Sequence, residues 1–103
     1  MPYISEGNRK NLDECIDRLV SCIKSNLLYK DDDKSLWNMV GDINYCFSRV
    51  LGQLMGSVSY SKIAIITGVL ENVKQEFYRR ISSPYEDAKI LQNGDIKEYK
   101  KLK

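Results

Sequence analysis

Apolar residues recur every three or four positions along most of the chain, which is the spacing of one face of an α-helix. In the first third of the sequence this face is made by Leu12, Ile16, Leu19, Ile23 and Leu27. Ser5, Asn8 or Asn11 can cap the start of such a helix through its side-chain oxygen. The pattern predicts a packing helix over about residues 8–28.

The spacing is most regular in a second predicted helix, over about residues 34–55. Its apolar positions alternate by four and three, as in the seam of a coiled coil, and are Leu36, Val40, Ile43, Phe47, Val50 and Leu54. Such a seam requires a partner helix. Asp33 is placed to cap this helix and Gly56 to end it. The preceding acidic run, residues 29–34, is interpreted as a turn rather than a cation site, because it lacks the spaced ligands of a calcium loop.

A third amphipathic helix is predicted over residues 60–81, with Ser59 as its N-cap. Its buried stripe is expected to contain Ile63, Ile66, Val69 or Leu70, Val73, Phe77 and Ile81. Gly68 lies in the middle of this helix, where glycine costs up to about 1 kcal/mol relative to alanine. A glycine at such a position often marks a close crossing of two helices.

The segment from Ser83 to Glu86 predicts the end of one helix and the start of a new one. Ser83 would cap that helix, Pro84 would occupy its first position, and Glu86 would reach back to complete a capping box. The short helix should span residues 84–92 and end at Asn93 and Gly94. Residues 95–103 are expected to form a basic tail or a short strand.

Together these elements predict a small all-α fold, in which residues 1–103 form a single domain. The expected architecture is a three-helix up-down-up bundle with a short fourth helix and a basic C-terminal tail. At 103 residues the chain can bury only a small core.

The charge pattern gives little support for binding to duplex nucleic acid. The net charge is only +2, and the last eight residues, IKEYKKLK, carry a net charge of +3 by themselves. A basic tail of this kind is either a solvated end or a contact to phosphate or to an acidic partner. Nucleic-acid binding through the tail is therefore kept as a third hypothesis.

Catalytic and metal-binding signatures are absent from the sequence. The chain has no His, which is the commonest acid–base group near neutral pH and a common metal ligand. Its three Cys residues form no closely spaced pair, and they read as small apolar residues in a reducing compartment. No phosphate loop or nucleophile elbow occurs. We therefore expect a non-enzymatic protein without metal or cofactor.

The sequence predicts a cytosolic location. Its start lacks the apolar run of a signal peptide, and no stretch approaches the roughly 20 apolar residues of a membrane span.

Two groups of polar and aromatic residues suggest a ligand site. Arginine and lysine recognise phosphate, and tyrosine offers a ring on which a base can stack. The candidate ligand-binding residues are Tyr45, Arg49, Tyr78, Arg79, Arg80, Tyr85 and Lys89. The alternative interpretation is purely structural: Tyr78 and Tyr85 would pack, and the adjacent arginines would pair with Glu76 and Glu86.

Three blocks of sequence carry a resemblance to a known family. They are the opening MPYI, the block GDINY at residues 41–45 followed by Arg49, and the run TGVLENVKQEFYRRISSPYEDAKILQNGD at residues 67–95. With these blocks the chain resembles a family of small uncharacterised phage, prophage and bacterial proteins. The resemblance covers most of the chain and is weakest at residues 29–35 and in the basic tail. It implies a phage or prophage setting without implying an activity.

The leading hypothesis is a homo-oligomeric binder that sequesters an anionic nucleotide immune signal, of cyclic-oligonucleotide or ADP-ribose type, at a subunit interface. Arg49, Arg79 or Arg80, and Lys89 would contact phosphates. Tyr45, Tyr78 or Tyr85 would stack on the base. The alternative hypothesis is a protein-interaction module that inhibits or scaffolds a host or phage protein through the seam of the second helix.

Overall fold

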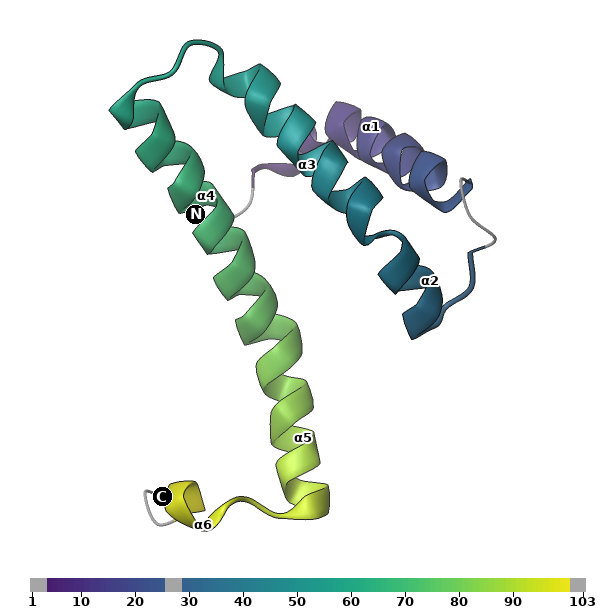
Figure 1. The fold of residues 1–103 in the computed structure, drawn as a ribbon, viewed down its shortest axis with the longest axis vertical. Coiled ribbons are helices and arrows are strands. Elements are labelled where there is room, and N and C mark those ends of the chain that lie inside the picture. Colours follow the sequence, from purple (N-terminus) through teal and green to yellow (C-terminus); the bar gives the residue numbers. More distant parts are fainter. Residues whose placement is uncertain (1–3, 26–28, 101–103) are drawn as a thin grey trace. The chain divides into compact units, whose positions relative to one another are not determined.

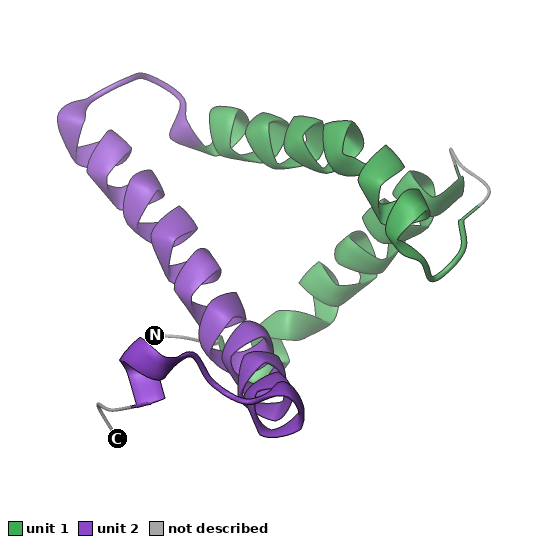
Figure 2. Cartoon of the chain, turned by 60° about the horizontal axis from the view of Figure 1, so that its bottom comes forward, with its two compact units in different colours: residues 1–54 green, residues 55–103 purple. Residues whose placement is uncertain are grey.

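The computed structural model describes residues 4–25 and 29–100, and these residues form helices without any strand (Figure 1). The elements are α1 (Glu6–Ser25), α2 (Asp33–Asn38), α3 (Val40–Met55), α4 (Tyr60–Phe77), the π-helical segment η1 (Tyr78–Ser82), α5 (Ser83–Asn93) and α6 (Lys97–Lys100). The predicted all-α fold class is confirmed. The chain divides into two compact units, residues 1–54 and residues 55–103 (Figure 2).

In the first unit, α1 agrees closely with the first predicted helix. It begins at Glu6, directly after Ser5, whose carbonyl oxygen accepts a 3.1 Å hydrogen bond from the Asn8 N–H. The end that was predicted for this helix, at residues 26–28, lies outside the described residues.

The second predicted helix is divided into α2 and α3, which corrects the prediction of one uninterrupted element. The Met39 N–H donates to the Leu36 oxygen over 3.0 Å, and this tight turn ends α2 before α3 begins at Val40. The cap also differs from the prediction, because Asp32 rather than Asp33 accepts from the Ser35 N–H, over 2.7 Å. Asp33 takes the first helical position instead, where its negative charge still interacts favourably with the helix dipole.

In the second unit, both predicted signals around the start of α4 are confirmed. The Ser59 hydroxyl accepts a 3.2 Å hydrogen bond from the Lys62 N–H, which is the expected N-cap. Gly56, which follows α3, adopts φ +64°, a conformation that glycine reaches without a steric penalty.

Pro84 does not interrupt the helix, contrary to the prediction. Ser83 is helical (φ −61°, ψ −49°), and its N–H donates to the Tyr78 oxygen five residues earlier. Pro84 has no N–H, and in a regular α-helix its ring would meet the carbonyl of Arg80. The wider π-helical turn of η1 accommodates the proline, so that α4, η1 and α5 follow one another without interruption (Figure 1). The predicted capping box of Ser83 and Glu86 therefore does not form.

The C-terminal end of α5 agrees with the prediction. Gly94 adopts φ +87°, and its N–H donates to the Ile90 oxygen over 2.8 Å. The next segment is a short helix, α6, rather than a strand.

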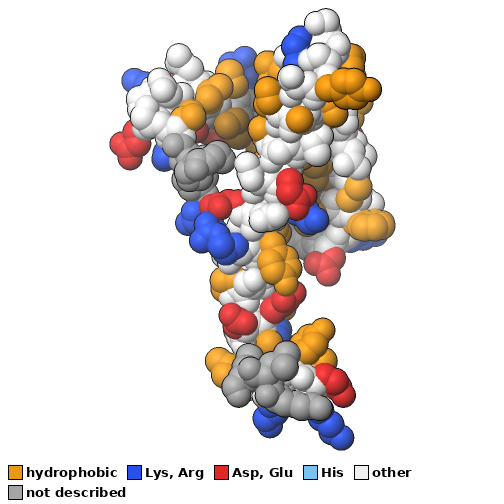
Figure 3. Space-filling view, turned by 90° about the vertical axis from the view of Figure 1, so that its left-hand side faces the viewer, with side chains coloured by type: hydrophobic (Ala, Val, Ile, Leu, Met, Phe, Trp, Pro, Cys, Tyr) orange, Lys and Arg blue, Asp and Glu red, His pale blue; other side chains and the backbone are white. Residues whose placement is uncertain are grey.

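Burial is very limited in this chain. Among the described residues, Met39 alone is a buried hydrophobic residue, with 5% of its surface exposed. Members of each predicted stripe are exposed, including Leu12, Phe47 and Phe77. Hydrophobic side chains are visible among the charged ones on the face drawn in Figure 3. Within each unit as described, these side chains are therefore not covered, which differs from the expectation of buried stripes.

Candidate functional site

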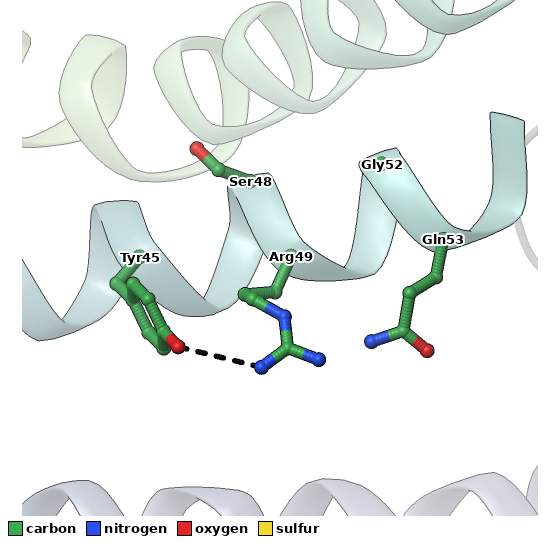
Figure 4. Close-up of a pocket in the computed structure, with 5 residues that line it drawn as sticks. All are labelled: Tyr45, Ser48, Arg49, Gly52 and Gln53. Atoms are coloured by element: carbon green, nitrogen blue, oxygen red, sulfur yellow. Dashed lines mark hydrogen bonds between the residues drawn. The ribbon is translucent and has the colours of Figure 1, made fainter.

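Tyr45 and Arg49 lie one turn apart on α3 and contact each other (Figure 4). Arg49 Nη1 donates to the Tyr45 hydroxyl oxygen over 3.3 Å. The guanidinium carbon lies 5.9 Å from the centroid of the Tyr45 ring, within the range of a cation–π interaction. The structure therefore brings these two predicted site residues together.

This pair lines an open hollow of about 400 Å³ along α3. The lining residues are Tyr45, Ser48, Arg49, Gly52 and Gln53. They include one positive charge, two hydroxyls and an amide, but no carboxylate. A Cβ added at Gly52 would meet nothing within 4 Å, so packing among the described residues does not require glycine there.

Tyr45 also influences the electrostatics of Arg49. The hydrogen bond to Tyr45 raises the pKa of the Arg49 guanidinium, and electrostatic attraction to the same side chain adds to this effect. Because arginine is already charged at all ordinary pH values, this shift leaves the positive charge of Arg49 in the hollow unchanged.

The other candidate arginines share one carboxylate at the junction of α4 and η1. Arg79 Nη2 lies 3.0 Å from Glu76 Oε2, and Arg80 Nη1 lies 3.2 Å from Glu76 Oε1. The two arginine side chains are 73% and 54% exposed, whereas that of Glu76 is 29% exposed. This arrangement agrees with the structural interpretation in that both arginines are ion-paired, yet both keep much of their surface open to solvent.

The aromatic members of this cluster also have partners. The Tyr78 hydroxyl donates to Glu86 Oε2 over 3.2 Å. Lys89 Nζ lies 5.5 Å from the centroid of the Tyr85 ring and donates to Gln92 Oε1 over 3.3 Å. Glu86 therefore contacts a tyrosine, where the structural interpretation expected an arginine.

The predicted site residues thus form two groups. Tyr45 and Arg49 belong to the first unit, and the remaining five residues, from Tyr78 to Lys89, belong to the second. Sequence reasoning missed Ser48 and Gln53 as lining residues of the hollow. The spacing contains a signal for Gln53, because it lies one turn beyond Arg49, as Tyr45 lies one turn before it.

The described part of the chain contains neither a candidate metal site nor a candidate membrane-spanning helix. Within residues 4–25 and 29–100, no group of His, Cys, Asp and Glu side chains is arranged to hold a metal ion. In the same ranges, no helix has both the length and the apolar character needed to span a membrane.

The fold and the candidate site together define a small all-α protein with an exposed arginine–tyrosine pair. The sequence pattern of the family described as Domain of unknown function (DUF6899) matches residues 1–96, and the chain belongs to this family. The resemblance to an uncharacterised family is thereby confirmed, whereas its phage setting stays a prediction. No curated protein and no solved structure matches the chain.

Proposed function

We propose that this protein is a non-enzymatic, phage-type binding protein that sequesters an anionic nucleotide signal between subunits and so counters host anti-phage defence. The signal would be of cyclic-oligonucleotide or ADP-ribose type, and the protein would act in the host cytoplasm. The observation that carries the proposal is the Tyr45–Arg49 pair, in which a permanent positive charge lies beside an exposed ring in a hollow lined without carboxylates.

The chemistry of the hollow suits a nucleotide. A guanidinium has five N–H donors in a planar fork, and the contact with Tyr45 uses only one of its nitrogens. The rest of the fork matches two oxygens of a phosphate. The Tyr45 ring can stack on a base, and the Gln53 amide, which extends to the same side of α3 as Arg49 (Figure 4), can bind ribose or base edges.

The cluster in the second unit would supply further phosphate contacts. The Arg79 and Arg80 side chains keep 73% and 54% of their surface exposed, so a phosphate can approach both from the solvent while they stay paired with Glu76. Lys89 adds a cation near the Tyr85 ring. The phage setting rests on the sequence resemblance described above, and the homo-oligomer rests on the exposed apolar stripes.

Native mass spectrometry after incubation with cyclic oligonucleotides and ADP-ribose isomers tests the proposal. We expect an oligomer that carries a stoichiometric ligand. Arg49→Ala should abolish this adduct, and Arg49→Lys should weaken it, because lysine keeps the charge but loses the planar fork. Arg18→Ala, which removes an exposed arginine from α1, is the matched control. Unchanged binding in Arg49→Ala and in the Arg79→Ala, Arg80→Ala double variant would rule out the assigned site.

The alternative function, a protein-interaction module, is favoured by a separate observation. The α2–α3 seam is exposed at Leu36, Val40, Phe47, Val50 and Leu54. Val50→Asp should then abolish cross-linking to the partner while the chain keeps its helicity, and Gln53→Asp should preserve that cross-linking. A stoichiometric nucleotide adduct that survives Val50→Asp would favour the nucleotide hypothesis.

A further inference from the structure

The uninterrupted helix from α4 through η1 to α5 is longer than any other helix of the described residues. From Tyr60 to Asn93 it spans roughly 50 Å at 1.5 Å per residue. By the same measure α1 spans roughly 30 Å and α3 roughly 24 Å. No single helix of the first unit can therefore accompany the long helix over its whole length.

An apolar stripe runs along the first two thirds of this long helix, at steps of three or four residues, through Ile63, Ile66, Leu70, Val73, Phe77 and Ile81. The exposed members of the stripe are Ile63, Leu70, Val73, Phe77 and Ile81. Phe77 is 62% exposed, and no residue of the second unit is buried among those described. The second unit therefore provides no cover of its own for this stripe.

The accessible area shows how much cover is needed. The chain exposes 9532 Å², whereas a folded monomer of 11.9 kDa is expected to expose about 6,000 Å². An interface between two units of one chain removes up to about 1,500 Å². About 2,000 Å² would then remain in excess for each chain, which is well above the ~800 Å² that each partner buries in a standard interface.

We propose that this stripe is a dimer interface and that the same helix of a second copy covers it. A second copy supplies the one element of matching length and of the same apolar spacing, and a two-fold axis would pair the stripe with itself.

This dimer gives the proposed function a specific subunit interface, and its link to a ligand rests on that proposed function. Arg79 and Arg80 lie between Phe77 and Ile81, the last two members of the stripe. Arg80 precedes Ile81 by one position and so flanks the stripe, whereas Arg79 is two positions from both Phe77 and Ile81 and lies on the opposite face of the helix. A dimer formed along the stripe would therefore carry two Glu76–Arg80 pairs at its edge, one from each copy. The site would take an anion with more than one phosphate.

Sedimentation equilibrium of the full chain without nucleotide tests the interface. We expect twice the chain mass of 11.9 kDa. Phe77→Glu should weaken association by about 30-fold or more, because it places an unpaired charge within the buried centre of the interface. Gln75→Glu, on the same helix and outside the stripe, should leave association unchanged. A wild-type chain that is monomeric, or a Phe77→Glu variant that associates as tightly as the Gln75→Glu control, would overturn the proposal.

Photo-cross-linking covers the case in which Phe77→Glu unfolds the chain. A photoreactive phenylalanine analogue replaces Phe77, and ¹⁵N-labelled and unlabelled chains are mixed. Mixed-isotope cross-links to α4, η1 or α5 support the interface, whereas cross-links to α1 or α3, or within one chain, overturn it. These assays contain no nucleotide, so they test the interface separately from the native mass spectrometry that tests nucleotide binding. A dimer that binds no nucleotide would refute the proposed ligand and leave the interface standing. A monomer that binds a nucleotide would do the opposite.

Discussion

The Tyr78 hydroxyl donates a 3.2 Å hydrogen bond to Glu86 across the π-helical segment η1. The two residues are eight positions apart, on either side of Pro84, which has no N–H to donate. The contact links α5 to the start of η1 at the point where regular helical hydrogen bonding is interrupted. π-Helical turns occur often at functional sites, and this one contains both Arg79 and Arg80.

Pro84→Ala should convert η1 into a regular α-helix. The substitution restores the missing N–H and removes the ring, and proline inside a helix costs about 3 kcal/mol relative to alanine. Because the π turn has already relieved part of this cost, we expect a gain of about 1–2 kcal/mol in the free energy of unfolding. Thermal unfolding followed by circular dichroism measures it. A loss of stability would show that the π turn is favoured by contacts other than those of the proline.

Removal of the two serines that begin predicted helices should have different effects. Ser59→Ala should cost about 1 kcal/mol of unfolding free energy, because it leaves the Lys62 N–H without its cap. Ser83→Ala should be close to neutral, because Ser83 lies inside a continuous helix and makes no cap hydrogen bond through its side chain. Chemical denaturation of both variants provides the comparison. Equal losses would mean that a second helix begins at Ser83.

Gly68→Ala should stabilise the chain by about 0.5–1 kcal/mol, because a helical glycine loses more backbone entropy on folding than alanine does. A Cβ at this position would meet nothing within 4 Å. Gly94→Ala is the contrasting variant: its φ of +87° is strained for alanine, so the substitution should be destabilising. A destabilising Gly68→Ala would instead reveal a close helix crossing at Gly68.

Nucleotide binding that depends on Arg49 should not vary between about pH 6 and about pH 9. The contact with Tyr45 raises the pKa of Arg49 above its ordinary value. A raised pKa keeps the cation, and any interaction that needs it, at every pH below the ordinary arginine value; both are lost only as the pH rises through the raised value. Isothermal titration calorimetry across this range is the measurement. A change in affinity within it would assign a role to another titrating group.

The sequence predicted features that depend on neighbouring residues more successfully than features that depend on distant ones. Helical periodicity, the Ser59 cap and the Gly94 terminator are local effects, and all three are confirmed. The cap is Asp32 rather than Asp33; consecutive aspartates offer equivalent local choices, because each has a backbone N–H three residues later. Periodicity also identified the apolar stripes correctly, but it carries no information about which surface covers them.

Within the candidate site, the sequence likewise predicted contacts between residues that are close in sequence. The contact between Tyr45 and Arg49 follows from their spacing of four residues on one helix. The sharing of Glu76 by Arg79 and Arg80 also follows from spacings of three and four residues. The π turn did not follow from spacing, because Ser83 and Pro84 match a helix start equally well. A proline can either end a helix or be accommodated by a wider turn, and the rest of the helix decides between these outcomes.

The scarcity of buried residues has a consequence for the behaviour of the protein in a cell. A unit without a buried residue gains little free energy from folding in isolation, so under the proposed dimer its native state would depend on association. The folded fraction then rises with the amount of protein synthesised. Chains made below the dissociation constant would remain open to proteolysis, and those made above it would persist. The dissociation constant would therefore act as a threshold in expression level that separates rapid turnover from accumulation.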